Sequence, residues 1–408
     1  MRLLYVADGR SPIARSWIQH FIGTDQEVHL LSTFACEPLP GLASLTIVPV
    51  AFSGLVRARS APSSRAEGSV SEFSGWQGTK TIRLRTALRH WLGPLTLGRA
   101  AGHARQAIAK IQPDLLHAMR IPFEGALAAA CEPESRLLIS VWGNDFTLHA
   151  PATPMMRRLT RRTIARADAL HTDCQRDQRL AMSWGFRAGR PVAVLPGNGG
   201  IREDIFYPGE PGDPASPGLA RALRTIPANA PVVVNPRGFR AYVRSDTFFR
   251  SIPMVLAVHP DAVFLCAAMA GERQANRWIE RLGIQASVQL LPKLSPSDMG
   301  VLFRRAWVMV SASEHDGTPN SLLEAMACGA YPVCGDLESI REWIVDGQTG
   351  SLVDPRDPDA LAQAVSRALT DGPFRAEAAR QNGRIIAKRA SYGAGMALAE
   401  AFYREILA

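Results

Sequence analysis

Short apolar runs alternate with longer stretches of helical periodicity along the whole chain. In the first half, runs rich in β-branched and aliphatic residues predict strands at 3–6, 28–31, 45–50, 115–117, 137–141 and 192–195. In the second half, similar runs predict strands at 232–235, 263–267, 288–291, 307–310, 331–334 and 351–353. Helical periodicity is clearest at 154–166, 246–258, 272–282 and 358–369. Strands that alternate with helices require parallel sheets covered on both faces, so the two series predict two doubly wound α/β domains.

A proline-rich stretch separates the two series of strands. Residues 208–217 contain four prolines and two glycines, a composition typical of a linker. We therefore expect domains at 1–207 and 232–390, a linker at 208–231 and a final helix at 391–408. A further stretch, 57–78, is rich in Ser, Gly and Ala and predicts a long surface loop.

The composition is that of a large globular protein. The chain has 408 residues, of which 47% are hydrophobic and 20% are charged, which excludes an acidic disordered chain, a collagen-like repeat and a small disulfide-rich protein. No run of 18 apolar residues occurs, and Asp8 and Arg10 interrupt the N-terminus too early for a signal peptide. The six cysteines lack metal-site spacing and are expected to be buried thiols. We therefore expect a cytoplasmic protein that does not span a membrane.

Positive charge is concentrated in the first half of the chain. Of the overall +9, residues 1–200 carry +10 (24 basic against 14 acidic side chains), and the remainder carries −1 (22 against 23). Seven basic residues and no acidic one lie in 80–110, and five arginines lie in 157–166. Such segments suit an anionic membrane surface, a phosphorylated lipid or nucleic acid, and equally an ordinary solvated face. Base-stacking aromatic residues are scarce there, so nucleic acid is not expected as a partner.

The strongest candidate for chemistry is the segment 313–329, SEHDGTPNSLLEAMACG, which follows a predicted strand. Ligands of open α/β sheets bind at the carboxyl ends of the strands. The chain turns at Asp316 and Gly317, and Thr318 is expected to cap a helix that ends at Gly329. The free N–H groups at the start of such a helix bind anions, and a diphosphate fits them. Glu324 lies eight residues after Asp316 on an otherwise apolar helix, where a carboxylate needs partners such as two vicinal sugar hydroxyls.

This segment resembles the motif of two carboxylates seven residues apart in the retaining family 4 glycosyltransferases of the GT-B fold. That family usually has Glu at both ends, and here Asp316 replaces the first. The resemblance continues through 330–333, 345–353 and 357–361, covers most of 232–390 strongly and extends more loosely into the N-terminal half. It implies two facing Rossmann-like domains with an interdomain cleft, the N-terminal one on the acceptor side and the C-terminal one binding a nucleoside-diphosphate sugar.

The resemblance also implies roles for the donor-side residues. Glu324 would hold the ribose hydroxyls and Asp316 would contact the transferred sugar. The backbone that cradles sugar and phosphate would be that of Gly317, Thr318, Pro319, Asn320, Ser321 and Leu322. Arg237, after the strand at 232–235, matches a family arginine that neutralises the diphosphate. The family's second cation is a lysine, which the chain lacks between 110 and 293, so Arg240 or Arg244 would replace it.

The N-terminal half offers weaker candidates, each directly after a predicted strand. Gly9 can let the backbone approach a phosphate, and Arg10 follows it on the acceptor side. His117 resembles a family histidine at the end of its strand. The resemblance implies that His117 is a catalytic residue and faces the cleft. Trp142 replaces a family histidine that touches the donor sugar, and it is expected on the acceptor side. Asp145 either binds acceptor hydroxyls or caps the next helix, and the sequence does not separate these two roles.

Together these features predict a retaining, metal-independent hexosyltransferase-type enzyme. No cofactor or metal is expected, and the acidic pair at 357 and 359 is explained by an Asp cap before a proline. The acceptor would be a sugar or a lipid-linked molecule in cell-surface polysaccharide or glycolipid assembly, with the basic half on the inner face of an anionic membrane. Two alternatives stay open, a sugar-nucleotide 2-epimerase of the same fold and a catalytically silent nucleotide-sugar-binding protein.

Overall fold

A computed structural model describes residues 1–55, 79–210, 212, 216–240 and 242–408. The described residues form two compact units. The first contains those of 1–71 and 83–200 together with Gly393–Ala408, and the second contains those of 72–82 and 201–392. The loop predicted at 57–78 lies outside the described residues. In the described part of the chain, no helix combines the length and apolarity needed to cross a bilayer.

The first unit is built on a seven-stranded parallel sheet with the order β3-β2-β1-β4-β5-β6-β7. Its strands are β1 (Arg2–Ala7), β2 (Glu27–Ser32), β3 (Ser44–Ile47), β4 (Leu115–Met119), β5 (Arg136–Val141), β6 (Ala169–Thr172) and β7 (Val192–Val194). The strand β6 was not predicted, because His171 and Thr172 interrupt its apolar pattern although both are buried. The tertiary structure tolerates them because each side chain finds a hydrogen-bond partner inside the fold.

The helices of the first unit are α1 (Pro12–Ile22), α3 (Leu97–Ile111), α4 (Ala126–Ala130), α5 (Pro154–Arg166), α6 (Gln175–Ser183) and α15 (Tyr392–Leu407), with short helical turns at Ser53–Leu55, Gly93–Thr96, Ile121–Gly125 and Asp145–His149. The helix α2 (Thr79–Leu92) is divided between the units, since 79–82 belong to the second and 83–92 to the first. One core joins alternate strand residues such as Leu4 and Val6 to Ala100 and Ala104 of α3. The last helix of the chain therefore belongs to the first unit, although the sequence places it after the second.

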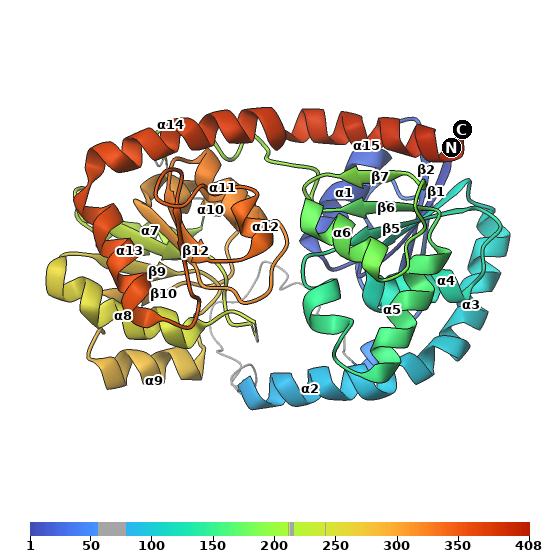
Figure 1. The fold of residues 1–408 in the computed structure, drawn as a ribbon, viewed down its shortest axis with the longest axis horizontal. Helices are drawn as coiled ribbons and strands as arrows, with labels where there is room; N and C mark the ends of the chain where they lie inside the picture. The colour runs from blue at the N-terminus through green and yellow to red at the C-terminus, as the bar shows by residue number, and fades with distance from the viewer. Residues whose placement is uncertain (56–78, 211, 213–215, 241) are drawn as a thin grey trace. The chain divides into compact units, whose positions relative to one another are not determined.

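The second unit is built on a six-stranded parallel sheet with the order β10-β9-β8-β11-β12-β13. Its strands are β8 (Val232–Asn235), β9 (Val263–Cys266), β10 (Val288–Leu290), β11 (Val308–Ser311), β12 (Tyr331–Gly335) and β13 (Ser351–Val353). Its helices are α7 (Pro217–Arg224), α8 (Ser245–Val258), α9 (Arg273–Leu282), α10 (Pro296–Arg305), α11 (Asn320–Ala327), α12 (Glu338–Arg341), α13 (Pro358–Thr370) and α14 (Gly372–Arg389) (Figure 1). The segment expected as a linker thus contains α7, whose Leu219 and Ala222 join the core of the second unit.

Two hydrophobic cores sandwich the second sheet. Val232 and Val234 of β8 face one core, which includes residues of α7, α10 and α11. Val233 lies between them in sequence and faces the other core, with residues of α8 and α13. This alternation is what a strand buried on both faces requires. The cap predicted before α13 is confirmed, since the Asp357 carboxylate accepts hydrogen bonds from the backbone N–H groups of Asp359 and Ala360.

The strand orders place two topological switch points. In the first sheet β1 lies between β2 and β4, and in the second β8 lies between β9 and β11. The crossover connections leave in opposite directions from these central strands. A crevice forms outside the carboxyl ends of neighbouring strands at such a point, and ligands bind there. The residues that follow β1 and β4, and those that follow β8 and β11, are therefore the candidates for a functional site.

Candidate active site

Arg237 stands at the switch point of the second sheet, directly after β8. The side chain of Asn235 accepts a hydrogen bond from the backbone N–H of Arg237 (3.0 Å), which fixes the turn. One terminal nitrogen of the guanidinium donates to both carboxylate oxygens of Asp316 (2.9 and 2.8 Å), and the other donates to the Ser321 hydroxyl (3.3 Å). Three residues from the two sequence-predicted segments are thereby brought together in one ion-paired cluster.

The charged guanidinium of Arg237 is buried, since only 8% of the residue is exposed. Burial lowers the pKa of Arg237, but the facing Asp316 carboxylate outweighs burial, so the pKa lies above its usual value. Its Nε is buried and has no hydrogen-bond partner among the described residues. A buried N–H without an acceptor is costly, and an oxyanion bound there would remove that cost.

The turn before α11 is held by hydrogen bonds to the segment that follows β12. The Ser339 hydroxyl donates to the carbonyl oxygen of Asp316 (2.7 Å), and the indole N–H of Trp343 donates to the Thr318 hydroxyl (2.9 Å). Thr318 was expected to cap the helix. Instead Pro319 occupies the cap position of α11, and its side chain makes no capping hydrogen bond. The backbone N–H groups at the start of α11 are thus left without a side-chain acceptor from the cap residue.

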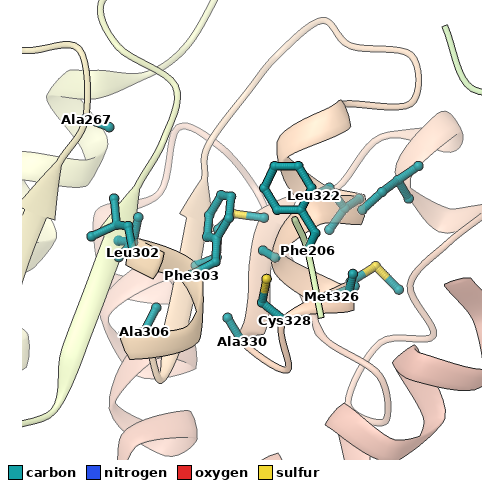
Figure 2. Close-up of a cluster of buried hydrophobic side chains, with 14 of the residues drawn as sticks. Phe206, Ala267, Leu302, Phe303, Ala306, Leu322, Met326, Cys328 and Ala330 are labelled. Carbon is teal, nitrogen blue, oxygen red and sulfur yellow. The ribbon is translucent and has the colours of Figure 1, made fainter. Parts of the chain in front are cut away.

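Glu324 lies on α11 among residues that are mostly buried. Leu322 and Met326 pack with Phe206, Phe303 and neighbouring residues in the core that Figure 2 shows. Glu324 itself is only half-buried, and no residue in the described part of the chain donates a hydrogen bond to its carboxylate. Burial raises the pKa of Glu324 to about 7, although the nearby Arg237 lowers it. Asp316 is therefore paired, whereas Glu324 is available to a ligand.

The two candidates for the second cation differ in their partners. Arg244 is held by two carboxylates, since it donates to Asp246 (2.9 and 2.7 Å) and to Glu314 (3.4 Å). Arg240 is exposed and donates to the carbonyl oxygen of Arg237 (3.1 Å) and to the Tyr242 hydroxyl (3.0 Å). Because Arg244 is already neutralised, Arg240 is the better candidate for a phosphate contact.

In the first unit, Gly9 and Arg10 follow β1 as expected. The backbone N–H of Gly9 donates to the Ser32 hydroxyl (3.0 Å), and a Cβ at this position would lie 2.3 Å from the Cys36 sulfur. Glycine is therefore required there by packing inside the fold. Arg10 pairs with Asp8 (2.9 Å), and its guanidinium carbon lies 3.6 Å from the centre of the Phe34 ring. The donor contact expected of Gly9 and the acceptor contact expected of Arg10 stay predictions.

His117 lies inside a buried hydrogen-bond network. Its Nδ1 accepts from the Tyr403 hydroxyl of α15 (2.6 Å), and its Nε2 bonds to the Ser140 hydroxyl (2.7 Å). The chain of bonds continues from Ser140 to His171, whose Nε2 donates to the carbonyl oxygen of Leu195 (3.0 Å). Because burial lowers the pKa of both rings, both are neutral, and that last bond then sets the direction of the others. Burial lowers the pKa of His117 well below its usual value. These contacts favour a structural role, and the catalytic role stays a prediction.

Asp145 joins the carboxyl ends of β4 and β5 rather than capping a helix by its side chain. Its carboxylate accepts from the Arg120 Nε (2.9 Å) and from the backbone N–H groups of Ile121 (3.0 Å) and Trp142 (3.2 Å). It is 1% exposed. Asp145 therefore positions Arg120 and Trp142, and both of these line a cavity at the first switch point. Direct contact of Asp145 or Trp142 with an acceptor stays a prediction.

The cavity at the first switch point has a volume of about 240 Å³. It contains basic residues that sequence reasoning missed, Arg89, Arg120 and His149. Arg120 directly follows β4, so the strand-end rule was sufficient to find it. Arg89 comes from α2, far from any strand end, and the sequence marks it only as one of seven basic residues in 80–110.

Another cavity, of about 840 Å³, opens at the amino ends of β8, β9 and β10, opposite the edge where ligands of such sheets bind.

One cluster of potential metal ligands occurs among the described residues, at the start of α6. It comprises Asp173, Cys174 and Asp177. Asp177 is paired with Arg176 (2.7 Å), whose guanidinium also donates to the Gly143 carbonyl oxygen (2.7 Å). Burial raises the pKa of the Cys174 thiol far above its usual value, so the thiol is neutral at pH 7. A neutral thiol and an ion-paired carboxylate do not favour a metal ion.

Two protein-family models match the two halves of the chain. The model described as glycosyl transferases group 1 matches residues 222–385, and the model described as glycosyl transferase 4-like domain matches residues 32–197. The D-inositol 3-phosphate glycosyltransferase of Acidothermus cellulolyticus is 27% identical over 230 residues, which are 53% of this chain and 49% of that protein. The match therefore spans about half the length of this curated relative.

Solved structures share the arrangement of elements over nearly the whole chain. Sucrose-phosphate synthase from Thermosynechococcus elongatus superposes with a TM-score of 0.75 at 16% identity, covering 99% of this chain and 98% of that one. The Anabaena protein HepE in complex with UDP-glucose superposes with a TM-score of 0.71 at 16% identity, covering 99% and 100%. At this level of identity the similarity establishes the fold.

Proposed function

The chain belongs to the group 1 glycosyltransferases and has the GT-B fold, and on this premise we propose that it transfers a sugar from a nucleoside-diphosphate sugar to a hydroxyl group of an acceptor. The observation that carries the proposal is the Glu324 carboxylate, which has no hydrogen-bond donor in the described part of the chain and lies close enough to Arg237 for its pKa to respond. Two ribose hydroxyls would supply the donors that Glu324 lacks.

The leaving diphosphate needs positive charge as its bond to the sugar breaks. Arg237 offers a buried Nε with no acceptor among the described residues, and Arg240 adds an exposed guanidinium beside it. The backbone N–H groups at the start of α11 add the positive end of the helix dipole. Preorganised donors of this kind are worth on the order of 10²–10³ in rate each when they stabilise a transition state.

Asp316 would contact the transferred sugar. Because it already holds Arg237 through one nitrogen, it also orients the guanidinium toward the diphosphate. An Asp is one methylene shorter than the Glu usual in the family, and a change of donor reach or sugar preference follows from that difference.

The test of the donor site is a thermal-shift panel with UDP, GDP and ADP and their glucose derivatives. UDP-glucose is the first probe, because the similar Anabaena protein was solved with it. We expect one series to raise the melting temperature of the full chain and Glu324→Ala to abolish that rise. Glu280→Ala, on the exposed face of α9, is the matched control and should respond like the wild type. A panel without any shift would refute the proposal.

We further propose that transfer retains the anomeric configuration and requires no metal, as the resemblance to the retaining family implies. The configuration of the product is read from the proton coupling at its anomeric carbon, and an inverted product would refute retention. Activity that disappears with a chelator and returns with added Mg²⁺ would refute metal independence. Donor consumed without an acceptor would favour the epimerase, and donor bound without any turnover would favour the silent binding protein.

We propose that the acceptor is presented at an anionic membrane, in cell-surface polysaccharide or glycolipid assembly. The Trp91 surface supports this, and it consists of the exposed apolar residues Leu88, Trp91, Leu92 and Leu95, which are 41–67% exposed. The Thr153 hydroxyl at the start of α5 donates to the carbonyl oxygen of His90 (3.4 Å), which brings the exposed arginines of α5 beside this surface. Apolar side chains flanked by arginines fit a bilayer with acidic headgroups.

Vesicle sedimentation tests the membrane proposal. We expect binding to vesicles that contain an anionic phospholipid, weaker binding in high salt and little binding to neutral vesicles. Trp91→Ser should weaken binding, whereas Val258→Ser, which removes an equally exposed apolar side chain from the second unit, should not. Equal binding to neutral and anionic vesicles would contradict the proposal.

A further inference from the structure

The cavity at the first switch point is lined by residues from several strand ends and from α2. Asp8 and Ser11 follow β1, Arg120 follows β4, Trp142 follows β5, and Arg89 reaches in from α2. All of them belong to the first unit. The convergence of one helix and three strand ends on a small pocket is typical of a ligand site.

Arg89 is the most unusual residue of this pocket. Its guanidinium carbon lies 4.8 Å from the centre of the Phe123 ring and 5.4 Å from that of Phe34. Its Nε is buried and makes no hydrogen bond within the described part of the chain, and no carboxylate there forms an ion pair with Arg89. Two aromatic rings fix the guanidinium and remove water from it, which leaves a charged donor without an acceptor.

Arg120 provides a second cation, and hydrogen bonds fix the position of its guanidinium. Its guanidinium donates to Asp145 (2.9 Å), to Asn144 (2.9 Å) and to His149 (2.8 Å). Its backbone has a φ of 145°, a conformation that favours glycine. A non-glycine residue held in such a conformation carries strain, and strain of this kind gathers at functional sites.

The acidic residues that line the pocket, Asp8 and Glu124, form no ion pair with Arg89. Burial lowers the pKa of Arg89 more strongly than the charge of these two residues raises it. Asp8 is paired with Arg10 (2.9 Å). Glu124 is 3% exposed and accepts a hydrogen bond from the Thr33 hydroxyl (2.7 Å), and burial raises its pKa. The two histidines, His90 and His149, bond to each other (2.9 Å). Among the described residues, the pocket therefore holds one arginine that forms no ion pair and a second that is anchored by its own hydrogen bonds.

We propose that this pocket binds a phosphate group, with Arg89 as the principal ligand and Arg120 as the second. Phosphate binding at Arg89 does not depend on the proposed function. The further statement that this phosphate is part of the acceptor does rest on the proposed function. A planar guanidinium matches two phosphate oxygens and binds them by paired charge-assisted hydrogen bonds. The acceptor would then be a hydroxyl compound that carries a phosphate ester, either soluble or as the headgroup of a lipid.

The test uses the full chain and measures binding by calorimetry. Glycerol 3-phosphate is the probe and glycerol is its uncharged control. We expect glycerol 3-phosphate to bind and glycerol not to bind. Arg89→Met, which keeps the aliphatic stem, should weaken binding by about tenfold or more, and Arg89→Lys should weaken it less. Arg99→Met, on the exposed face of α3, should bind as the wild type does. Each variant is first checked by its melting temperature.

A second arm separates the two sources of phosphate. Phosphatidylcholine vesicles with and without phosphatidic acid are sedimented with the same variants. If Arg89→Met weakens the binding of glycerol 3-phosphate, the pocket is assigned to a soluble phosphate. If it weakens only the binding to vesicles that contain phosphatidic acid, the pocket is assigned to a lipid headgroup. Arg89→Met that behaves as the wild type in both arms overturns the proposal, and so does binding that is lost in Arg237→Met and kept in Arg89→Met. Neither arm involves sugar transfer, so failure of the proposed function would leave both results readable.

Discussion

Glu324 is expected to change its charge in the neutral pH range, because burial raises its pKa to about 7. Hydroxyl donors favour the ionised carboxylate, so a bound donor lowers this pKa and releases a proton. The affinity for the nucleoside-diphosphate sugar should therefore rise with pH and level off above about pH 8. Between pH 7 and pH 6 it should fall by up to about fivefold, a bound set by titration of a single group. Calorimetric titration over pH 5.5–8 measures this effect.

The matched variant for this pH dependence is Glu324→Gln, which keeps the shape of the side chain and does not titrate. Its donor affinity should be lower than that of the wild type at pH 8 and flat across the range. A pH profile that is equally steep in Glu324→Gln would assign the titration to another group and would contradict the role given to Glu324.

At the scale of elements, the packing of α15 depends on the absence of a side chain at Gly395. A Cβ there would lie 2.0 Å from the carbonyl oxygen of Gly199, whereas a Cβ at Gly393 on the same helix would meet no atom within 4 Å. Gly395→Ala should therefore push α15 from its place and destabilise the first unit by about 1–3 kcal/mol. Gly393→Ala should be neutral or stabilising by up to about 1 kcal/mol, because alanine favours helix.

Chemical denaturation followed by far-ultraviolet circular dichroism measures both glycine variants. The pair is informative because the same substitution is made two residues apart on one helix. Equal effects of the two substitutions would contradict the close approach of α15 to residue 199.

At the scale of the whole molecule, the buried histidine network predicts a stability that depends on pH. Burial lowers the pKa of His171 to about 4 and also lowers that of His117 well below its usual value. The unfolded chain binds protons at about pH 6.5, so it takes up more protons than the folded chain between about pH 6.5 and 4. The stability contributed by the neutral rings is thus present above about pH 6.5 and is lost as the pH falls, by about 2 kcal/mol for His171 at pH 5.

The variant His171→Gln isolates this contribution from other titrating groups. Buried carboxyl groups with raised pKa values, such as Glu124 and Asp145, act in the opposite direction. The quantity to compare is therefore the slope of the melting temperature against pH. Between pH 6.5 and 5, the melting temperature of His171→Gln should fall less steeply than that of the wild type. His103→Gln, on the exposed face of α3, should keep the wild-type slope. Identical slopes in all three proteins would contradict a neutral buried His171.

The sequence by itself determined the alternation of strands and helices and the two doubly wound domains, because hydrophobic periodicity is local and survives without tertiary contacts. It also determined the pairing of candidates around Arg237 and Glu324, since both follow strands whose carboxyl ends share one edge. The strand β6 escaped prediction because its buried His171 reads as polar until its partners in the fold are known. The cap of α11 was predicted at the wrong residue for a similar reason, because a distant partner was not visible in the sequence. The Thr318 hydroxyl accepts a hydrogen bond from the Trp343 indole, and Pro319 occupies the cap position.

Only the tertiary structure decided which candidate side chains are available. His117 has both ring nitrogens occupied by residues distant in sequence, one of them Tyr403 of the last helix. Arg244 is paired with two carboxylates, whereas Arg240 is paired with none in the described part of the chain, although the sequence treats them alike. Arg89 reaches its pocket from a helix that the sequence marks only by its basic charge and not as part of a pocket. Burial, pairing and charge balance depend on contacts between distant segments, and such contacts arise only when the chain is folded.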